Sequence, residues 1–207
     1  MGLGDLFTRL FFGKKDSHFF ASDAQQTKNV MNAANGVAPL MNGTIKERDG
    51  GDEVHITGKF AGASTRVKFQ KSFAGVTVEM KTEGAYPFFM LTYDEDGRAA
   101  YGKELENRDE WDDDDDDDEL KVFVSDHLYY EGDSQEIAEK KALWEKFPQD
   151  LRDGIVSKLE ERKGHFMVAP DGKFEVNIGD GVLGMGSEVE VVQSLLDLLS
   201  RTIQTVS

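Results

Sequence analysis

The sequence predicts an α+β fold in which helices pack on one face of an antiparallel β meander. Three observations lead to this prediction. Apolar and polar residues alternate through residues 44–93, which is typical of half-buried strands. Segments before and after this stretch carry apolar residues at helical spacing. The order of a helix followed by antiparallel strands occurs twice, so we expect two similar halves, residues 17–108 and 120–207, that form either one domain or two.

Residues 1–16 read MGLGDLFTRLFFGKKD and predict an amphipathic helix that ends at Gly13. Residues 1–15 carry a net charge of +2, opposite in sign to the rest of the chain. Two interpretations are open: the helix docks on the protein's own core, or it attaches the chain weakly to a protein partner or an anionic membrane surface. The residues that would make this contact are Leu3, Leu6, Phe7, Leu10 and Phe11.

A second helix begins at a cap formed by Ser22 or Asp23 and runs to about Asn35, where we expect Gly36 to end it. Its apolar side contains Val30, Met31 and Ala34.

The alternation that follows predicts three or four strands between Thr44 and Tyr93, broken by turns that contain glycine, including one at Gly58. Residues 88–93 form a further expected strand. The elements expected in the second half are a strand over 120–124, a helix over 134–147, a helix that Pro148 begins and Gly164 ends, a hairpin over 165–169 and 173–178, and a long apolar helix after Ser187.

Charge and composition exclude several functions. The chain has 24 Lys and Arg against 40 Asp and Glu, a net charge of -16, which disfavours nucleic-acid binding because that needs basic side chains facing the phosphates. It has no Cys, so disulfides, thiolate metal sites and a Cys nucleophile are excluded. No apolar stretch is long enough to span a bilayer. We expect a cytoplasmic protein, with peripheral contact at the inner face of the membrane if the N-terminal helix binds lipid.

Much of the negative charge lies in residues 109–119, which read DEWDDDDDDDE and contain ten acids. Without them the chain has a net charge of -6. Mutual repulsion predicts a disordered loop between the halves. Its carboxylates are weak candidates for divalent cations, namely Asp112, Asp114, Asp116 and Asp118. Trp111 is a candidate anchor for a basic protein partner, because an indole among acids has no place in a core.

For the other motifs, the sequence favours a structural role over a catalytic or binding role. Residues 179–184 match GxGxxG, but only one helix follows, so the βαβ unit of a dinucleotide site is missing and we expect no cofactor. Asp94, Asp96 and Gly97 suggest a calcium loop, yet Lys103 stands where a bidentate Glu is required. The four histidines are scattered. Aromatic residues at 86–89 and 129–130 suit either a binding surface or the core.

The second half contains LKVFVSD, a spacer and FPQDLRDGIVSKLEERKGHFMVAPDGKFEVNI, followed by a long apolar helix. The first half contains NAANGVAPLMNGTIKERDGGDEVHITGKFAGASTRVKFQ. Through the order of its apolar residues, the chain over residues 25–206 resembles an uncharacterised family of bacterial proteins of unknown function. It departs from that pattern at the seven Asp before Glu119. The resemblance implies neither an activity nor catalytic residues.

These observations favour a non-catalytic adaptor or structural interaction module of a larger assembly, attached through its N-terminal helix. One alternative is a domain that binds a small ligand or a divalent ion in a cleft between the halves. A carboxylate-dependent hydrolase is another, although no pair of acids stands out. The apolar last helix allows a homo-oligomer, and an intramolecular core explains its pattern equally well.

Overall fold

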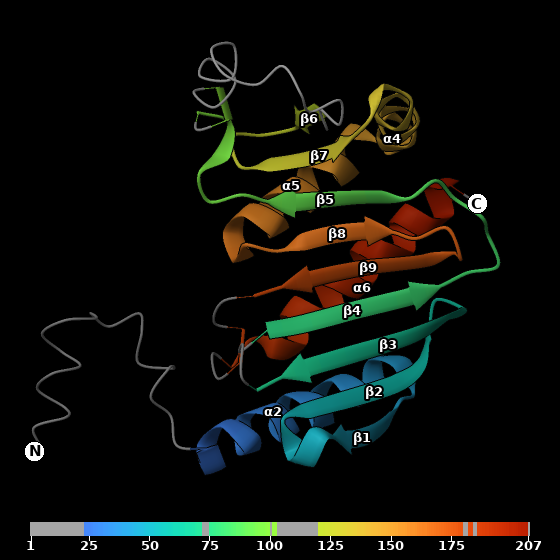
Figure 1. Ribbon diagram of the computed structural model, residues 1–207. Coiled ribbons are helices and arrows are strands. Elements are labelled where there is room, and N and C mark those ends of the chain that lie inside the picture. The colour runs from blue at the N-terminus through green and yellow to red at the C-terminus, as the bar shows by residue number, and fades with distance from the viewer. Residues whose placement is uncertain are drawn as a thin grey trace, which may run out of the picture.

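The computed structural model describes residues 23–71, 75–99, 101–102, 120–179, 182–183 and 186–206. Within them, nine antiparallel strands form one sheet in the order β1-β2-β3-β4-β9-β8-β5-β7-β6 (Figure 1). The strands are β1 Thr44–Arg48, β2 Glu53–Phe60, β3 Ala63–Gln70, β4 Gly75–Lys81, β5 Phe89–Tyr93, β6 Leu120–Phe123, β7 Leu128–Gly132, β8 His165–Val168 and β9 Lys173–Ile178. The α-helices are α2 Asp23–Val37, α4 Ser134–Lys146, α5 Gln149–Arg162 and α6 Glu188–Val206.

One continuous sheet runs through both halves of the sequence. Strand β4 pairs with β9, and β5 pairs with β8, so the β8–β9 hairpin lies between two strands of the first half. The segment that joins β4 to β5 therefore crosses the end of this hairpin (Figure 1). The meander predicted over residues 44–93 is confirmed for β1 to β4, which pair in sequence order.

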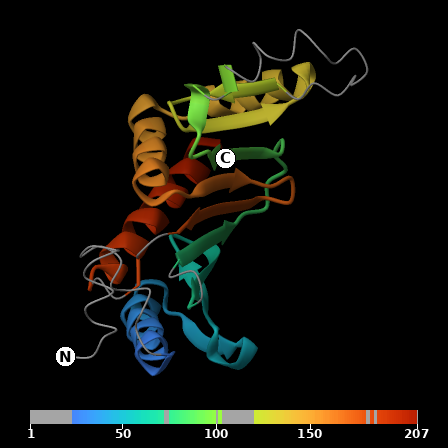
Figure 2. The same cartoon turned by 60° about the vertical axis from the view of Figure 1, so that its left-hand side comes forward.

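The four α-helices of the described residues lie on one side of the sheet, as the sequence predicts (Figure 2). Helix α6 packs against β4 and β9 and also contacts α2 and α5. It is buried on several sides, so the core of the same chain accounts for its apolar pattern. The largest fully buried side chains in this core include Phe69, Phe89, Phe147, Phe166 and Phe174. Among the described residues, no helix is both long and apolar enough to cross a bilayer.

Gly36 does not end the second helix, contrary to the prediction. Helix α2 continues to Val37, and a 3-10 turn follows over Ala38–Met41. A Cβ atom on Gly36 would lie 2.6 Å from Cγ2 of Val189. The glycine is needed because α2 and α6 approach each other closely at this point.

Three further predictions need correction. Gly58 lies inside β2, where it faces the backbone of Met41 and Gly43, and does not break the strand. Pro148 precedes α5 and is not its first residue as predicted, and the helix ends at Arg162, followed by Lys163 in a left-handed conformation. Strand β7 was not predicted.

Candidate functional site

The sheet has one face that no described helix covers. Because side chains alternate along a strand, one set is buried under the helices and the other set points to the uncovered face. Directly paired residues share a face, so the register assigns this set on every strand. The face has eight basic residues, which are Lys46, Arg48, Lys59, Arg66, Lys68, Lys81, Lys121 and Lys173. Its four acidic residues are Glu53, Glu79, Glu131 and Glu175.

The uncovered face therefore has a net charge of +4, within a chain whose net charge is -16. The remainder of the chain carries -20. Seven of the eight cations lie on β1, β2, β3, β4 and β9, so the positive charge is concentrated on one half of the sheet. This local reversal of charge is the feature that distinguishes the face from the rest of the molecule.

Three lysines form a row at one end of this half. Lys59 pairs with Ser64, Ser64 with Lys81, and Lys81 with Lys173, so the row crosses β2, β3, β4 and β9. We call these three lysines, together with Ser64, the lysine row. It contains no acid, and Lys81 and Lys173 are direct cross-strand neighbours of like charge. Such a pair is unfavourable unless negative charge lies nearby.

The next row across the same strands contains Thr57, Arg66, Glu79 and Glu175. Glu79 accepts an ion pair from Lys68 and another from Arg66, whose Nη1 lies 3.5 Å from Oε2. The two glutamates are largely covered, with side chains 12% and 13% exposed. Arg66 and Lys81 are 49% and 57% exposed. The positive charge therefore faces the solvent while the balancing carboxylates lie beneath it.

Glu175 is held as a carboxylate by two donors. His165 Nε2 lies 3.3 Å from one oxygen, and Lys173 Nζ donates to the other at 3.0 Å. The hydrogen bond from His165 is the largest cause that lowers the pKa of Glu175 to about 2, and Lys173 adds to it, while burial opposes the shift. At neutral pH this carboxylate is ionised and neutralises part of the charge of its neighbours.

A second acid on the face has a similar arrangement. Gln70 Nε2 donates to Glu53 at 3.0 Å, and His55 Nε2 lies 2.9 Å from the other oxygen of Glu53. These two hydrogen bonds, with the one from Gln70 the larger cause, lower the pKa of Glu53. Both histidines that the sequence places in strands thus serve to position glutamates.

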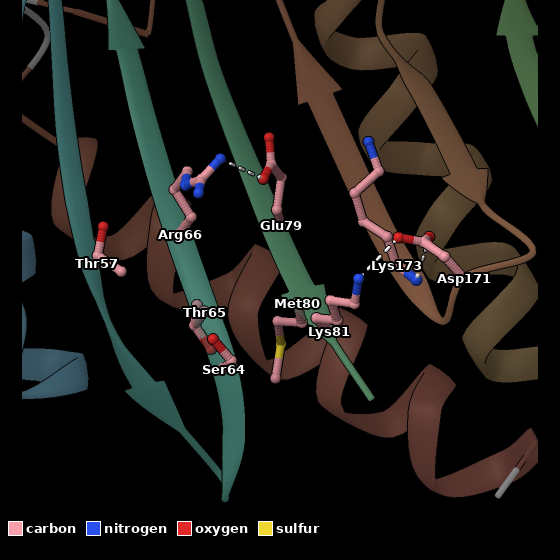
Figure 3. Close-up of a pocket in the computed structure, with 9 residues that line it drawn as sticks. All are labelled: Thr57, Ser64, Thr65, Arg66, Glu79, Met80, Lys81, Asp171 and Lys173. Carbon is pink, nitrogen blue, oxygen red and sulfur yellow. Dashed lines mark hydrogen bonds and ion pairs between the residues drawn. The ribbon is translucent and has the colours of Figure 1, made fainter. Parts of the chain in front are cut away.

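A hollow of about 240 Å³ opens between the lysine row and the row beside it (Figure 3). Arg66 and Glu79 lie on one side, and Lys81, Lys173 and Asp171 lie on the other. Asp171 belongs to the β8–β9 turn, and its carboxylate accepts from Lys81 Nζ at 2.8 Å. That bond is the main cause of the lowered pKa of Asp171.

The turn that presents Asp171 depends on Gly172. This residue has φ of +79°, and a Cβ atom there would lie 2.5 Å from the carbonyl oxygen of Thr82. The backbone nitrogen of Thr82 also donates to the Gly172 carbonyl at 3.0 Å. This hydrogen bond holds the β4–β5 connection against the hairpin turn beside the hollow.

The other half of the face is more apolar. A second hollow, of about 250 Å³, is lined by Phe88, Met90, Thr92, Tyr129, Tyr130, Glu131, Glu136 and Lys140. Phe88 is 45% exposed, whereas Phe89 and Tyr130 are buried in the core. Lys140 Nζ donates to the carbonyl of Glu131 at 2.6 Å and to Glu136 at 3.0 Å. Of the aromatic candidates, the structure thus places Phe88 on the surface.

The calcium-like turn at Asp94 and the histidine beside it have structural contacts. Asp94 accepts from the backbone nitrogen of Asp96 in a tight turn, and His127 Nδ1 lies 3.2 Å from the carbonyl of Asp94. Within the described parts of the chain, no three His, Asp or Glu side chains gather as a metal site requires. Asn177 Nδ2 donates to Thr77 Oγ1 at 2.7 Å on the uncovered face.

Several predicted contact residues lie outside the described residues. They are Leu3, Leu6, Phe7, Leu10, Phe11, Trp111 and the acids Asp112, Asp114, Asp116 and Asp118.

The sequence did not predict the lysine row. Alternation alone would have placed Lys59 and Lys81 on the polar side of their strands, but not beside Lys173, which is 92 positions further along the chain than Lys81.

No protein-family model matches the chain, and neither the curated proteins nor the solved structures include a detectable match. The inference of function therefore has to come from the geometry and charge of the sheet.

Proposed function

We propose that this protein is a non-catalytic interaction module and that the uncovered face of its sheet binds a protein partner. The observation that carries the proposal is the charge of +4 on this face, against -20 on the remainder of the chain. Exposed cations set above covered glutamates present a positive surface of definite position, which favours a complementary partner and fixes its orientation.

The second hollow on the same face supports this function. Phe88 and Met90 supply apolar surface beside the basic half, and interfaces combine such apolar contacts with a charged rim. The predicted N-terminal helix and Trp111 would be additional attachment points in this proposal. The helix would fix the module to its assembly, and the sheet would receive the partner.

Site-specific photo-crosslinking in cells that naturally contain the protein tests this function. The photoreactive residue p-benzoylphenylalanine replaces Thr57 or Lys46 on the uncovered face, and Gln193 or Gln204 on the exposed side of α6 as matched controls. We expect one protein to be captured from both sheet positions and not from the α6 positions. Equal capture from both sides, or capture only from α6, would refute the proposed binding face.

A further inference from the structure

We infer that the lysine row and the hollow beside it bind an extended acidic segment of a protein partner. This inference rests on the proposed function and names the kind of partner that the face receives. Its basis is the register of β2, β3, β4 and β9, which brings Lys59, Lys81 and Lys173 into one row without an acid.

The spacing of the row suits an extended chain. Neighbouring strands lie about 4.8 Å apart, so the three steps from Lys59 to Lys173 span roughly 14 Å. Alternate side chains of an extended segment point the same way at intervals of about 7 Å. Three acidic side chains at alternate positions therefore span the same distance as the row. Ser64 adds a hydroxyl group between Lys59 and Lys81, and Thr57 in the neighbouring row adds another (Figure 3).

The negative charge already present would not prevent binding. Glu79 and Glu175 are covered: Glu79 is engaged with Lys68 and Arg66, and Glu175 with His165 and with Lys173 of the row. Lys81 is paired with Asp171, whose side chain is 60% exposed. An exposed pair of this kind contributes little to stability, so a partner carboxylate can replace Asp171 at small cost.

The surroundings of the row favour a peptide over a nucleic acid or a membrane. The row offers no aromatic ring on which a base could stack and no apolar side chain that could enter a bilayer. A short acidic segment needs only the cations and the serine hydroxyl of the row.

Fluorescence anisotropy with two labelled peptides tests the inference. One peptide is a four-fold Glu-Thr repeat and the other a four-fold Gln-Thr repeat, each measured with the full chain at low and moderate NaCl. We expect only the Glu peptide to bind, more weakly as salt rises. The row variant is Lys59→Gln, Lys81→Gln and Lys173→Gln, and we expect it to bind about tenfold more weakly, as the loss of three exposed ion pairs predicts.

A matched control separates local charge from total charge. Lys28→Gln, Lys141→Gln and Lys146→Gln together remove the same three charges from the helix side, where all three side chains are exposed. We expect this control to change the affinity less than twofold. Equal weakening in both variants would show that total charge decides binding and would overturn the inference.

A charge-reversed variant distinguishes the loss of the lysines from a loss of folding. Lys81→Glu with Lys173→Glu should abolish binding of the Glu peptide and create binding of a four-fold Lys-Thr repeat, a gain that an unfolded chain would not show selectively. If a 12-nucleotide single strand or a vesicle containing phosphatidylserine binds through the same lysines more tightly than the Glu peptide, that ligand replaces the acidic segment. Dimers that dissociate in the row variant would instead identify a second copy of this chain.

The inference and the proposed function can fail separately. Capture of a partner from Thr57 without any binding of the Glu peptide would refute the acidic segment and leave the interaction module standing. Peptide binding without any partner captured from the sheet would refute the module and leave an anion-binding row.

Discussion

At the scale of single residues, Glu175 links the charge of the uncovered face to the stability of the fold. Its pKa is about 2 because His165 and Lys173 donate to it, compared with an ordinary value of 4.5. Because folding lowers this pKa, ionised Glu175 stabilises the folded state at pH values above the ordinary pKa of 4.5. The stabilisation is lost as the pH falls from about 4.5 to 2.

We therefore predict that Glu175→Gln lowers the free energy of unfolding by about 1 kcal/mol at pH 7, because water screens part of the two charge-assisted hydrogen bonds. The difference from the unmodified chain should shrink as the pH falls from 5 toward 2. Urea unfolding followed by circular dichroism at pH 7, 4 and 3 measures it. Glu47→Gln, an exposed acid on β1, serves as the control. A difference that is constant over this pH range would contradict the prediction.

At the scale of elements, the contact of α2 with α6 depends on Gly36. Alanine at this position would favour the helix by about 0.5–1 kcal/mol, but its Cβ would lie only 2.6 Å from Val189 Cγ2. The clash outweighs the helix preference because a β-branched side chain near the start of a helix moves little.

We predict that Gly36→Ala destabilises the fold by about 1 kcal/mol. In a background with Val189→Ala the same change should instead stabilise it, because the clash is removed and the helix preference remains. Thermal unfolding of the four members of this double-mutant cycle is the measurement. Equal effects of Gly36→Ala in both backgrounds would show that the close approach has no energetic role.

The start of α4 has a side-chain cap. Asp133 Oδ1 accepts from the backbone nitrogens of Gln135 and Glu136, each at 2.8 Å. We predict that Asp133→Ala costs about 1 kcal/mol and that Asp133→Ser costs much less, since serine also caps helices. Hydrogen exchange of the first turn of α4 should increase in the alanine variant. Unchanged exchange there would mean that the cap does not limit fraying.

The elements were mostly predictable from local patterns. Alternation over residues 44–93 and apolar spacing in α5 and α6 have the periods of strands and helices, and the structure has those elements. The misplaced limits arose where tertiary contacts override local preference. Gly36 and Gly58 lie where a neighbouring segment packs closely against the backbone, and neither one forms a turn. Strand β7 follows directly on the turn after β6, and its adjacent Tyr129 and Tyr130 obscure the alternation of apolar and polar residues.

The candidate site was much less predictable. Polar residues on alternate positions predict a solvent-facing side for each strand, but the lysine row exists only because β9 pairs with β4. That pairing joins Lys81 to Lys173 across the sequence, and no local pattern encodes it. The charge of the face is likewise hidden in a chain whose sum is -16.

At the scale of the whole molecule, a single sheet joins the two sequence halves, and α6 packs on strands from both. We predict one cooperative unfolding transition. Trp111→Phe leaves Trp144, a buried residue of the second half, as the sole indole. A second variant with Trp111→Phe, Trp144→Phe and Phe60→Trp reports on the first half.

In each variant the urea midpoint by Trp fluorescence should coincide with the midpoint by far-UV circular dichroism. Separate midpoints would indicate that the two halves unfold independently, as separate domains on either side of residues 109–119 would.

The insertion of the β8–β9 hairpin between β4 and β5 has a consequence for how the protein is made. Synthesis from the N-terminus produces β4 and β5 long before their partners, which begin at His165. Until then both strands present unpaired backbone edges, and such edges promote association between chains. During synthesis the sheet therefore has a gap at its centre. Only the residues of the β8–β9 hairpin close that gap, so β4 and β5 gain their shared neighbours after the residues between them and His165 have been made.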